Sequence, residues 1–112
     1  MRVHAPRPAR FDLNLAISFA GEDATIAGHC VNVSASGMLA AFPKPLELFT
    51  KGKISLLVEE YFVDIRARVA RTQGLDAGLA FIIETENDRR VIELLLEHAI
   101  AQHQPTNQSE LG

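Results

Sequence analysis

The sequence predicts a mainly β fold, with six antiparallel strands in a barrel or a sandwich and one helix at the C-terminal end. Short runs of alternating apolar and polar residues recur about every ten residues, and turn-forming residues separate them. After residue 85 the apolar period lengthens from two residues to that of a helix. At 112 residues the chain is long enough for one domain with its own core and too short for two.

The first three predicted strands occupy the N-terminal half. Alternation starts at residue 12 and places Leu13, Leu15, Ile17 and Phe19 on one face until Gly21-Glu22-Asp23 ends the run. A second, less regular strand covers residues 26–33. A third strand points Met38, Ala40 and Phe42 to one side, and the prolines at positions 43 and 45 stop it.

The next three strands follow a connection at residues 46–52. The fourth covers residues 53–58, and Glu59-Glu60 makes a tight turn into the fifth, the most regular of the six. The predicted inward residues of the fifth strand are Val63, Ile65, Ala67 and Val69. Thr72-Gln73-Gly74 then leads to the sixth strand, whose predicted inward residues are Leu75, Ala77, Leu79, Phe81 and Ile83.

One amphipathic helix is predicted over residues 86–103, packed on the sheet. Thr85 is a suitable N-cap, and Asp88, three residues later, completes an approximate capping box. The predicted buried stripe is Ile92, Leu95, Leu96, Ala99 and Ile100. Leu94 falls outside the stripe. It indicates either a partner surface or, more commonly, a singly exposed leucine.

Charge is distributed unevenly along the chain. The net charge of −3 does not favour general binding to nucleic acid, so no DNA partner is expected. Residues 1–11 contain three arginines and no acidic residue, and Pro6 and Pro8 favour an extended conformation there. We therefore predict a flexible basic arm at 1–11, a domain at 12–103 and a disordered polar tail at 104–112. A basic arm on an acidic body suggests one local anion site.

The sequence indicates a cytoplasmic protein that is not inserted in a membrane. Its single cysteine, Cys30, cannot form an internal disulfide. No apolar run approaches the length of a membrane span, and the proline- and arginine-containing N-terminus does not have the form of a signal peptide.

The residues that could support catalysis are dispersed. His29 and Cys30 are neighbours in a strand and should point to opposite faces, while His98 and His103 are five apart on the helix. No paired carboxylates, phosphate-binding glycine loop or nucleophile elbow is found. We expect no enzyme activity, no metal and no cofactor. The outward arginines of the fifth strand and its end, Arg66, Arg68 and Arg71, are either an anion-binding face or, more commonly, solvated strand charges.

The polar hexapeptide at residues 32–37, Asn-Val-Ser-Ala-Ser-Gly, lies between the second and third strands. Asn and Ser side chains hydrogen-bond local backbone, and Gly adopts angles that a Cβ forbids. Taken alone, the hexapeptide is most simply a structural turn. The basic arm about twenty residues upstream raises the second interpretation, that the turn holds a polar ligand.

Together, the arm and the hexapeptide make the chain resemble the PilZ domain family, bacterial receptors for cyclic di-GMP. The family signature is a pair of arginines four apart in an N-terminal arm, followed twenty to thirty residues later by Asp/Asn-x-Ser-x-x-Gly. Asn32, Ser34 and Gly37 match the second half, and Arg10 fits the second arginine. The first arginine would fall at Pro6, and Arg7 stands one residue late. The order of six strands and a helix also agrees, so the resemblance covers roughly residues 4–102.

The resemblance implies a six-stranded β-barrel that binds cyclic di-GMP. Arg7 and Arg10 would hold phosphate and guanine, Asn32 and Ser34 would hydrogen-bond the nucleotide, and Gly37 would let the backbone approach it. Ligand would draw the arm onto the barrel and create a surface for an effector protein in motility, biofilm or polysaccharide control. The displaced Arg7 leaves a second hypothesis: a degenerate PilZ module that binds proteins without nucleotide. Under either hypothesis the protein is expected to be a monomer or a homodimer.

Overall fold

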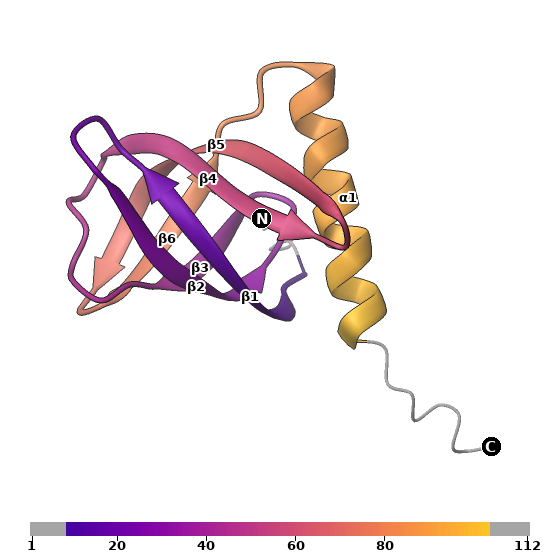
Figure 1. The fold of residues 1–112 in the computed structure, drawn as a ribbon, viewed down its shortest axis with the longest axis horizontal. Helices are drawn as coiled ribbons and strands as arrows, with labels where there is room; N and C mark the ends of the chain where they lie inside the picture. Colours follow the sequence, from indigo (N-terminus) through magenta and orange to yellow (C-terminus); the bar gives the residue numbers. More distant parts are fainter. Residues whose placement is uncertain (1–8, 104–112) are drawn as a thin grey trace, which may run out of the picture.

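Six strands close into an antiparallel barrel, and a single helix follows them (Figure 1). This architecture, seen in a computed structural model that describes residues 9–103, confirms the predicted barrel and C-terminal helix. The order around the barrel is β1-β2-β3-β6-β5-β4. The strands are β1 (Phe11–Ala20), β2 (Thr25–Val33), β3 (Gly37–Ala41), β4 (Lys51–Val58), β5 (Tyr61–Gln73) and β6 (Asp76–Phe81).

The predicted limits of the arm and the tail remain predictions. Strand β1 begins at Phe11, inside the range assigned to the arm. Arg7 and the rest of residues 1–8 lie outside the described residues, as do residues 104–112.

Alternation along the strands fills the barrel. The four predicted inward residues of β5 are buried, while Asp64 and Arg66 between them are exposed. In β6 the prediction extends too far, because Leu75 and Ile83 are both exposed. The ladders that pair β6 with β3 and β5 end at residues 76 and 81, so these two residues lie beyond the strand. Burial inside the barrel follows the pairing and not the apolar pattern alone.

Two bulges alter β1 and β2 at the barrel end that carries the polar turn. The register between these strands shifts between Asp12 and Leu15, and that between β2 and β3 shifts between Cys30 and Asn32. A bulge bends its strand and re-aims the neighbouring side chains. Both irregularities therefore lie where the predicted ligand residues are found.

Helix α1 (Glu86–His103) stands across that same end of the barrel and packs on β1 and β5 (Figure 1). The predicted capping box is confirmed: Asp88 N–H donates to Thr85 Oγ1, and Thr85 N–H donates to Asp88 Oδ2, both at 3.0 Å. Arg66 of β5 also reaches Asp88 Oδ2 at 2.8 Å. The backbone N–H of Glu84 donates to the same carboxylate, and these contacts lower the pKa of Asp88.

The apolar face of α1 is rotated slightly from the predicted one. Ile92, Leu95 and Ala99 are buried, but Ile100 is 41% exposed and Leu94 packs against the core. The prediction was thus wrong for Ile100, and Leu94 is not the exposed partner contact that was considered. The reason is that α1 packs against β1 and β5, and the position of these two strands determines which side of the helix is buried.

Candidate functional site

The polar turn between β2 and β3 is held together by its own hydrogen bonds. Ser34 N–H donates to the Gly37 carbonyl at 2.8 Å, and Ser36 N–H donates to Ser34 Oγ at 3.2 Å. Ser34 Oγ also lies 3.4 Å from the Gly37 carbonyl oxygen, to which it donates. Ser34 is only 1% exposed. Its hydroxyl, predicted to meet a ligand, is therefore engaged inside the turn, and the exposed hydroxyl of the turn belongs to Ser36.

Gly37 has a packing reason to be glycine. It is buried in β3 opposite β6, and a Cβ at this position would lie 2.4 Å from the Leu79 carbonyl oxygen. A side chain would push the two strands apart. The space left by the missing side chain is thus occupied by β6, whereas the sequence led us to expect it to admit a ligand.

Arg10 and Asn32 meet at the mouth of the turn. Arg10 Nη1 donates to Asn32 Oδ1 at 2.6 Å, across 22 residues of sequence. The predicted arginine and the predicted carboxamide are therefore brought together on the outside of the barrel, while Arg7 lies outside the described residues. Asp12 is the direct β1 neighbour of Asn32 and is exposed, so a carboxylate accompanies the guanidinium.

A shallow groove of about 380 Å³ adjoins this pair, between the outer face of β1 and β2 and the end of α1. His29 and Asn14 are hydrogen-bonded across it, through Nε2 and Oδ1. Neither residue was predicted to belong to the site. Their outward positions could be predicted from the strand alternation, but the bulges and the helix end that make the groove could not. The groove is lined by Asp12, Leu13, Asn14, His29, Cys30, Val31 and Gln102.

Two of the other candidate groups, His29 and Cys30, are neighbours in β2. His29 is exposed and Cys30 is buried, on opposite faces as predicted. Burial raises the pKa of the Cys30 thiol to about 12, which keeps it protonated at neutral pH. Among residues 9–103, no group of three or more His, Cys, Asp or Glu side chains is placed to hold a metal ion. Nor does this part of the chain contain a helix long and apolar enough to cross a membrane.

Arg66 is occupied by the helix cap. Its guanidinium pairs with Glu84 and with Asp88, each at 2.8 Å, and the hydrogen bond to Glu84 is the larger cause that raises its pKa. This arginine anchors α1 to β5. An anion-binding face made of Arg66, Arg68 and Arg71 was one of the two interpretations of these residues. Arg66 is not available for it, because both of its ion pairs are made within the protein.

A family model of the PilZ domain matches residues 2–98. The chain belongs to the PilZ family. PilZ domains in general are cyclic di-GMP receptors and interact with effector proteins, acting as binding or adaptor modules rather than enzymes.

The fold supports the same assignment. The crystal structure of the PilZ domain of CeSA from a cellulose-synthesizing bacterium superimposes with a TM-score of 0.72. The alignment covers 80% of this chain and 95% of that chain, with 15% sequence identity. This similarity establishes a shared barrel fold. No curated protein sequence matches the chain significantly.

Proposed function

We propose that this PilZ domain is a cytoplasmic cyclic di-GMP receptor that binds the nucleotide over the Arg10–Asn32 pair. The observation that supports the proposal best is the 2.6 Å hydrogen bond between these side chains. A guanidinium has five N–H donors, and the contact with Asn32 occupies one of them. The remaining donors suit phosphate oxygens and the edge of a guanine.

Each predicted site residue has a role in this proposal. Arg10 contacts phosphate and guanine, and the amide nitrogen of Asn32 donates to the nucleotide while its oxygen holds Arg10. Arg7 supplies a second guanidinium when the arm closes over the ligand. Ser34 and Gly37 act indirectly, because the first fastens the turn and the second seats it against β6. They fix the position of Asn32, which is what a preorganised polar site needs.

The proposal is tested by isothermal titration of the protein with cyclic di-GMP. One charge-assisted hydrogen bond contributes about 1.5–3 kcal/mol, so Arg10→Ala should weaken binding by about 10- to 150-fold. Arg71→Ala is the matched control, because it removes the same charge from an exposed position near the C-terminal end of β5. Its affinity for cyclic di-GMP should stay within about twofold of that of the unaltered protein. If cyclic di-GMP at high micromolar concentration gives no heat with the unaltered protein, the receptor proposal is wrong.

An adaptor that binds proteins without nucleotide is the second candidate, and the β4–β5 hairpin favours it. Three large apolar side chains are exposed at its tip: Leu57, Tyr61 and Phe62, the last 82% exposed. Leu57 and Phe62 are cross-strand partners, so they form one continuous surface. Exposed aromatic clusters of this kind mark protein interfaces.

The hairpin lies at the barrel end that carries Arg10 and Asn32. His98 of α1 is 3.5 Å from the Glu59 carboxylate in the hairpin turn, which places the tip beside the helix. In the receptor proposal this apolar tip is the surface that contacts the effector in motility, biofilm or polysaccharide control. In the adaptor proposal it serves alone, and the titration above distinguishes the two.

A further inference from the structure

The groove beside the Arg10–Asn32 pair has the size and the position of a site for one base of the nucleotide. Its volume of about 380 Å³ lies within the range of about 300–1,000 Å³ typical of small-molecule sites. Asp12 and Val31 line it, the first being the cross-strand neighbour of Asn32 and the second its neighbour in the chain. A nucleotide whose phosphate is held at Arg10 can therefore place the adjoining base over this groove.

Asn14 and His29 line the same groove on the outer face of β1 and β2. Asn14 follows Asp12 by two residues, and both are exposed, so their side chains lie on the same side of the strand. His29 is paired with Ala16 of β1. The small side chain of Ala16 leaves the imidazole room to reach diagonally across the strand to Asn14, to which it is hydrogen-bonded.

This hydrogen bond determines which end of the Asn14 carboxamide is left for a ligand. His29 Nε2 donates to Asn14 Oδ1, since a carbonyl oxygen can only accept. The free end is the amide nitrogen, which carries two N–H donors. In the part of the chain that the structure describes, that nitrogen has no hydrogen-bond partner. Asn14 therefore presents donors alone to whatever enters the groove.

Guanine and adenine differ at the edge that such donors would meet. Guanine carries the acceptors O6 and N7 there, whereas adenine carries a donating amino group at position 6. A fixed N–H donor therefore favours guanine, because adenine would bring one donor against another. The imidazole of His29 suits either base, since unpaired bases stack on aromatic side chains, histidine included.

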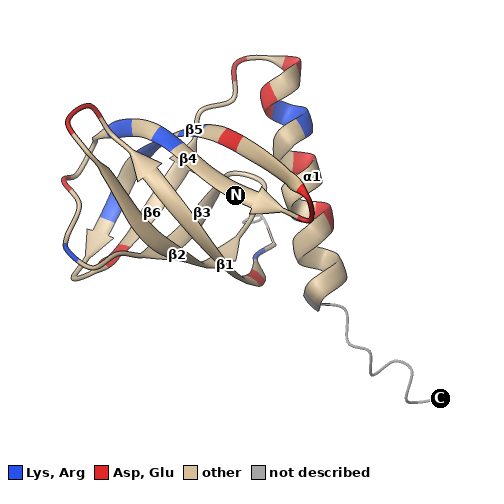
Figure 2. Cartoon of the chain, in the orientation of Figure 1, with Lys and Arg blue, Asp and Glu red and all other residues tan. Residues whose placement is uncertain are grey.

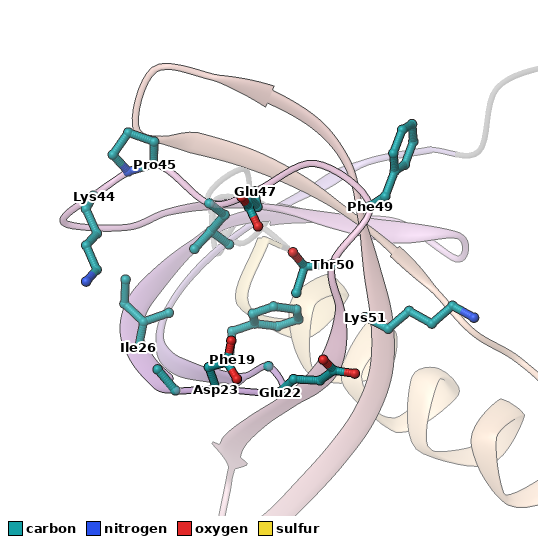
Figure 3. A pocket seen from close by; sticks show the side chains of 13 residues that line it. Phe19, Glu22, Asp23, Ile26, Lys44, Pro45, Glu47, Phe49, Thr50 and Lys51 are labelled. Carbon is teal, nitrogen blue, oxygen red and sulfur yellow. The ribbon is translucent and has the colours of Figure 1, made fainter.

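The cavity at the opposite end of the barrel carries no comparable preference. It measures about 570 Å³ and lies between the β1–β2 turn and the connection from β3 to β4 (Figure 3). Phe19 is only 2% exposed and offers no open ring face to a base. The charged side chains that line the cavity are of both signs: Glu22, Asp23, Lys44, Glu47 and Lys51.

We propose that Asn14, positioned by His29, makes the nucleotide site select guanine over adenine. The base would lie over His29 and Val31, and its O6 atom would accept a hydrogen bond from the Asn14 amide. Asp12 adjoins Asn32, at the end of the groove where the phosphate would lie. The inference rests on the proposed nucleotide site and assigns its base selectivity to two residues that the signature motif does not contain.

Titrations with cyclic di-GMP and with cyclic di-AMP, which differ only in their bases, test the proposal. The ratio of the two affinities isolates base selectivity, because the phosphates and sugars are the same. Asn14→Asp replaces the donating amide by an accepting carboxylate and should lower this ratio at least about fivefold, the smaller limit for reading one base. Asn87→Asp makes the same exposed change at the opposite end of α1 from Gln102 and should leave the ratio within about twofold.

His29→Phe tests the positioning role. The variant keeps an aromatic ring for stacking but loses the N–H that fixes the Asn14 carboxamide, which can then turn its oxygen towards an adenine. The ratio should fall about two- to tenfold, the range for one hydrogen bond, mainly through tighter binding of cyclic di-AMP. A purely structural role of His29 would weaken the binding of both nucleotides equally.

The outcomes distinguish this inference from the proposed function. If cyclic di-GMP binds but neither Asn14→Asp nor His29→Phe lowers the ratio, the base is not read in the groove and the inference is wrong, although the receptor proposal stands. A fall of the same size in Asn87→Asp would reveal a general charge effect and would also overturn the inference. If cyclic di-GMP gives no heat with the unaltered protein, the receptor proposal is wrong and the inference falls with it.

Discussion

The two ends of the barrel are made from the same six strands, yet they are finished differently. At one end α1 lies across the strands, the polar turn is locked, and Arg10 is bonded to Asn32. At the other end the connecting segments leave an open cavity over Phe19. The carboxylates of the β1–β2 turn lie at this second end, as Figure 2 shows. One small barrel thus has a helix-covered end, where a guanidinium and a carboxamide meet, and an uncovered end with an open cavity.

The helix is what makes the two ends different. Arg66 ties the start of α1 to β5 through Glu84 and Asp88, and Thr85 caps the first turn. The buried residues of α1 then close the end of the barrel from outside. The cavity end has no such cover within the described residues. Its shape is held by backbone hydrogen bonds of the segments that line it, including those of Phe49 and Thr50 to Val69.

Removing the helix contact should have the largest effect. Leu95→Ala deletes a fully buried side chain and should lower the free energy of unfolding by about 2–5 kcal/mol. Ile100→Ala on the same helix changes an exposed residue and is the matched control, with a much smaller loss expected. Urea unfolding measures both. Equal losses from the two variants would mean that α1 packs on a different face.

Alkaline pH should weaken the fold through Cys30. The folded pKa of about 12 lies above the unfolded value near 9, so the folded state binds the thiol proton more tightly. This contribution is complete below pH 9 and is lost as the pH rises towards 12, at about 1.4 kcal/mol per unit. Cys30→Ala removes the group and should flatten this part of the pH dependence. If the free energy of unfolding falls equally with pH in the unaltered protein and in Cys30→Ala, the thiol is not buried as described.

Removing the helix cap should have a smaller effect on stability. Thr85→Ala removes the hydroxyl that accepts from Asp88 N–H and should cost about 1 kcal/mol of stability. Thr25→Ala, at the exposed start of β2 near the cavity, should cost less, as that residue caps no helix. Thermal unfolding of the two variants decides the point. A larger loss from the β2 variant would show that the cap contributes little.

Asp12 should give the smallest effect. Its carboxylate neighbours Asn32 and repels a doubly charged nucleotide, so Asp12→Asn should tighten cyclic di-GMP binding about two- to fivefold. The gain should shrink as salt is raised, because exposed charges are screened. Titrations at two salt concentrations measure it. An unchanged affinity at low salt would place the nucleotide away from Asp12.

The sequence was sufficient for the local features of this molecule. Strand alternation, the capping box at Thr85 and Asp88, and the turn at residues 32–37 all depend on near neighbours in the chain. The exposure of Ile100 and of Ile83 could not be predicted, because it depends on where a helix crosses the barrel and where a ladder ends.

The residues of the candidate site also differ in how far they could be predicted. The resemblance to the PilZ family pointed to Arg10 and Asn32, and the structure joins their side chains by a hydrogen bond. The burial of Ser34 and the contact of Gly37 with β6 arise from strands that are distant in sequence. The cavity over Phe19 is lined by two stretches that are distant in sequence, residues 19–26 and 44–51, and no local pattern marks it.

Cyclic di-GMP is expected to bind at the helix end of the barrel, and amide NMR of the protein titrated with this nucleotide tests this position directly. We predict saturable shifts at residues 10–14 and 29–37, the helix end of the barrel, with residues 21–26 and 44–51 unaffected. Saturable shifts confined to the cavity end would contradict the account.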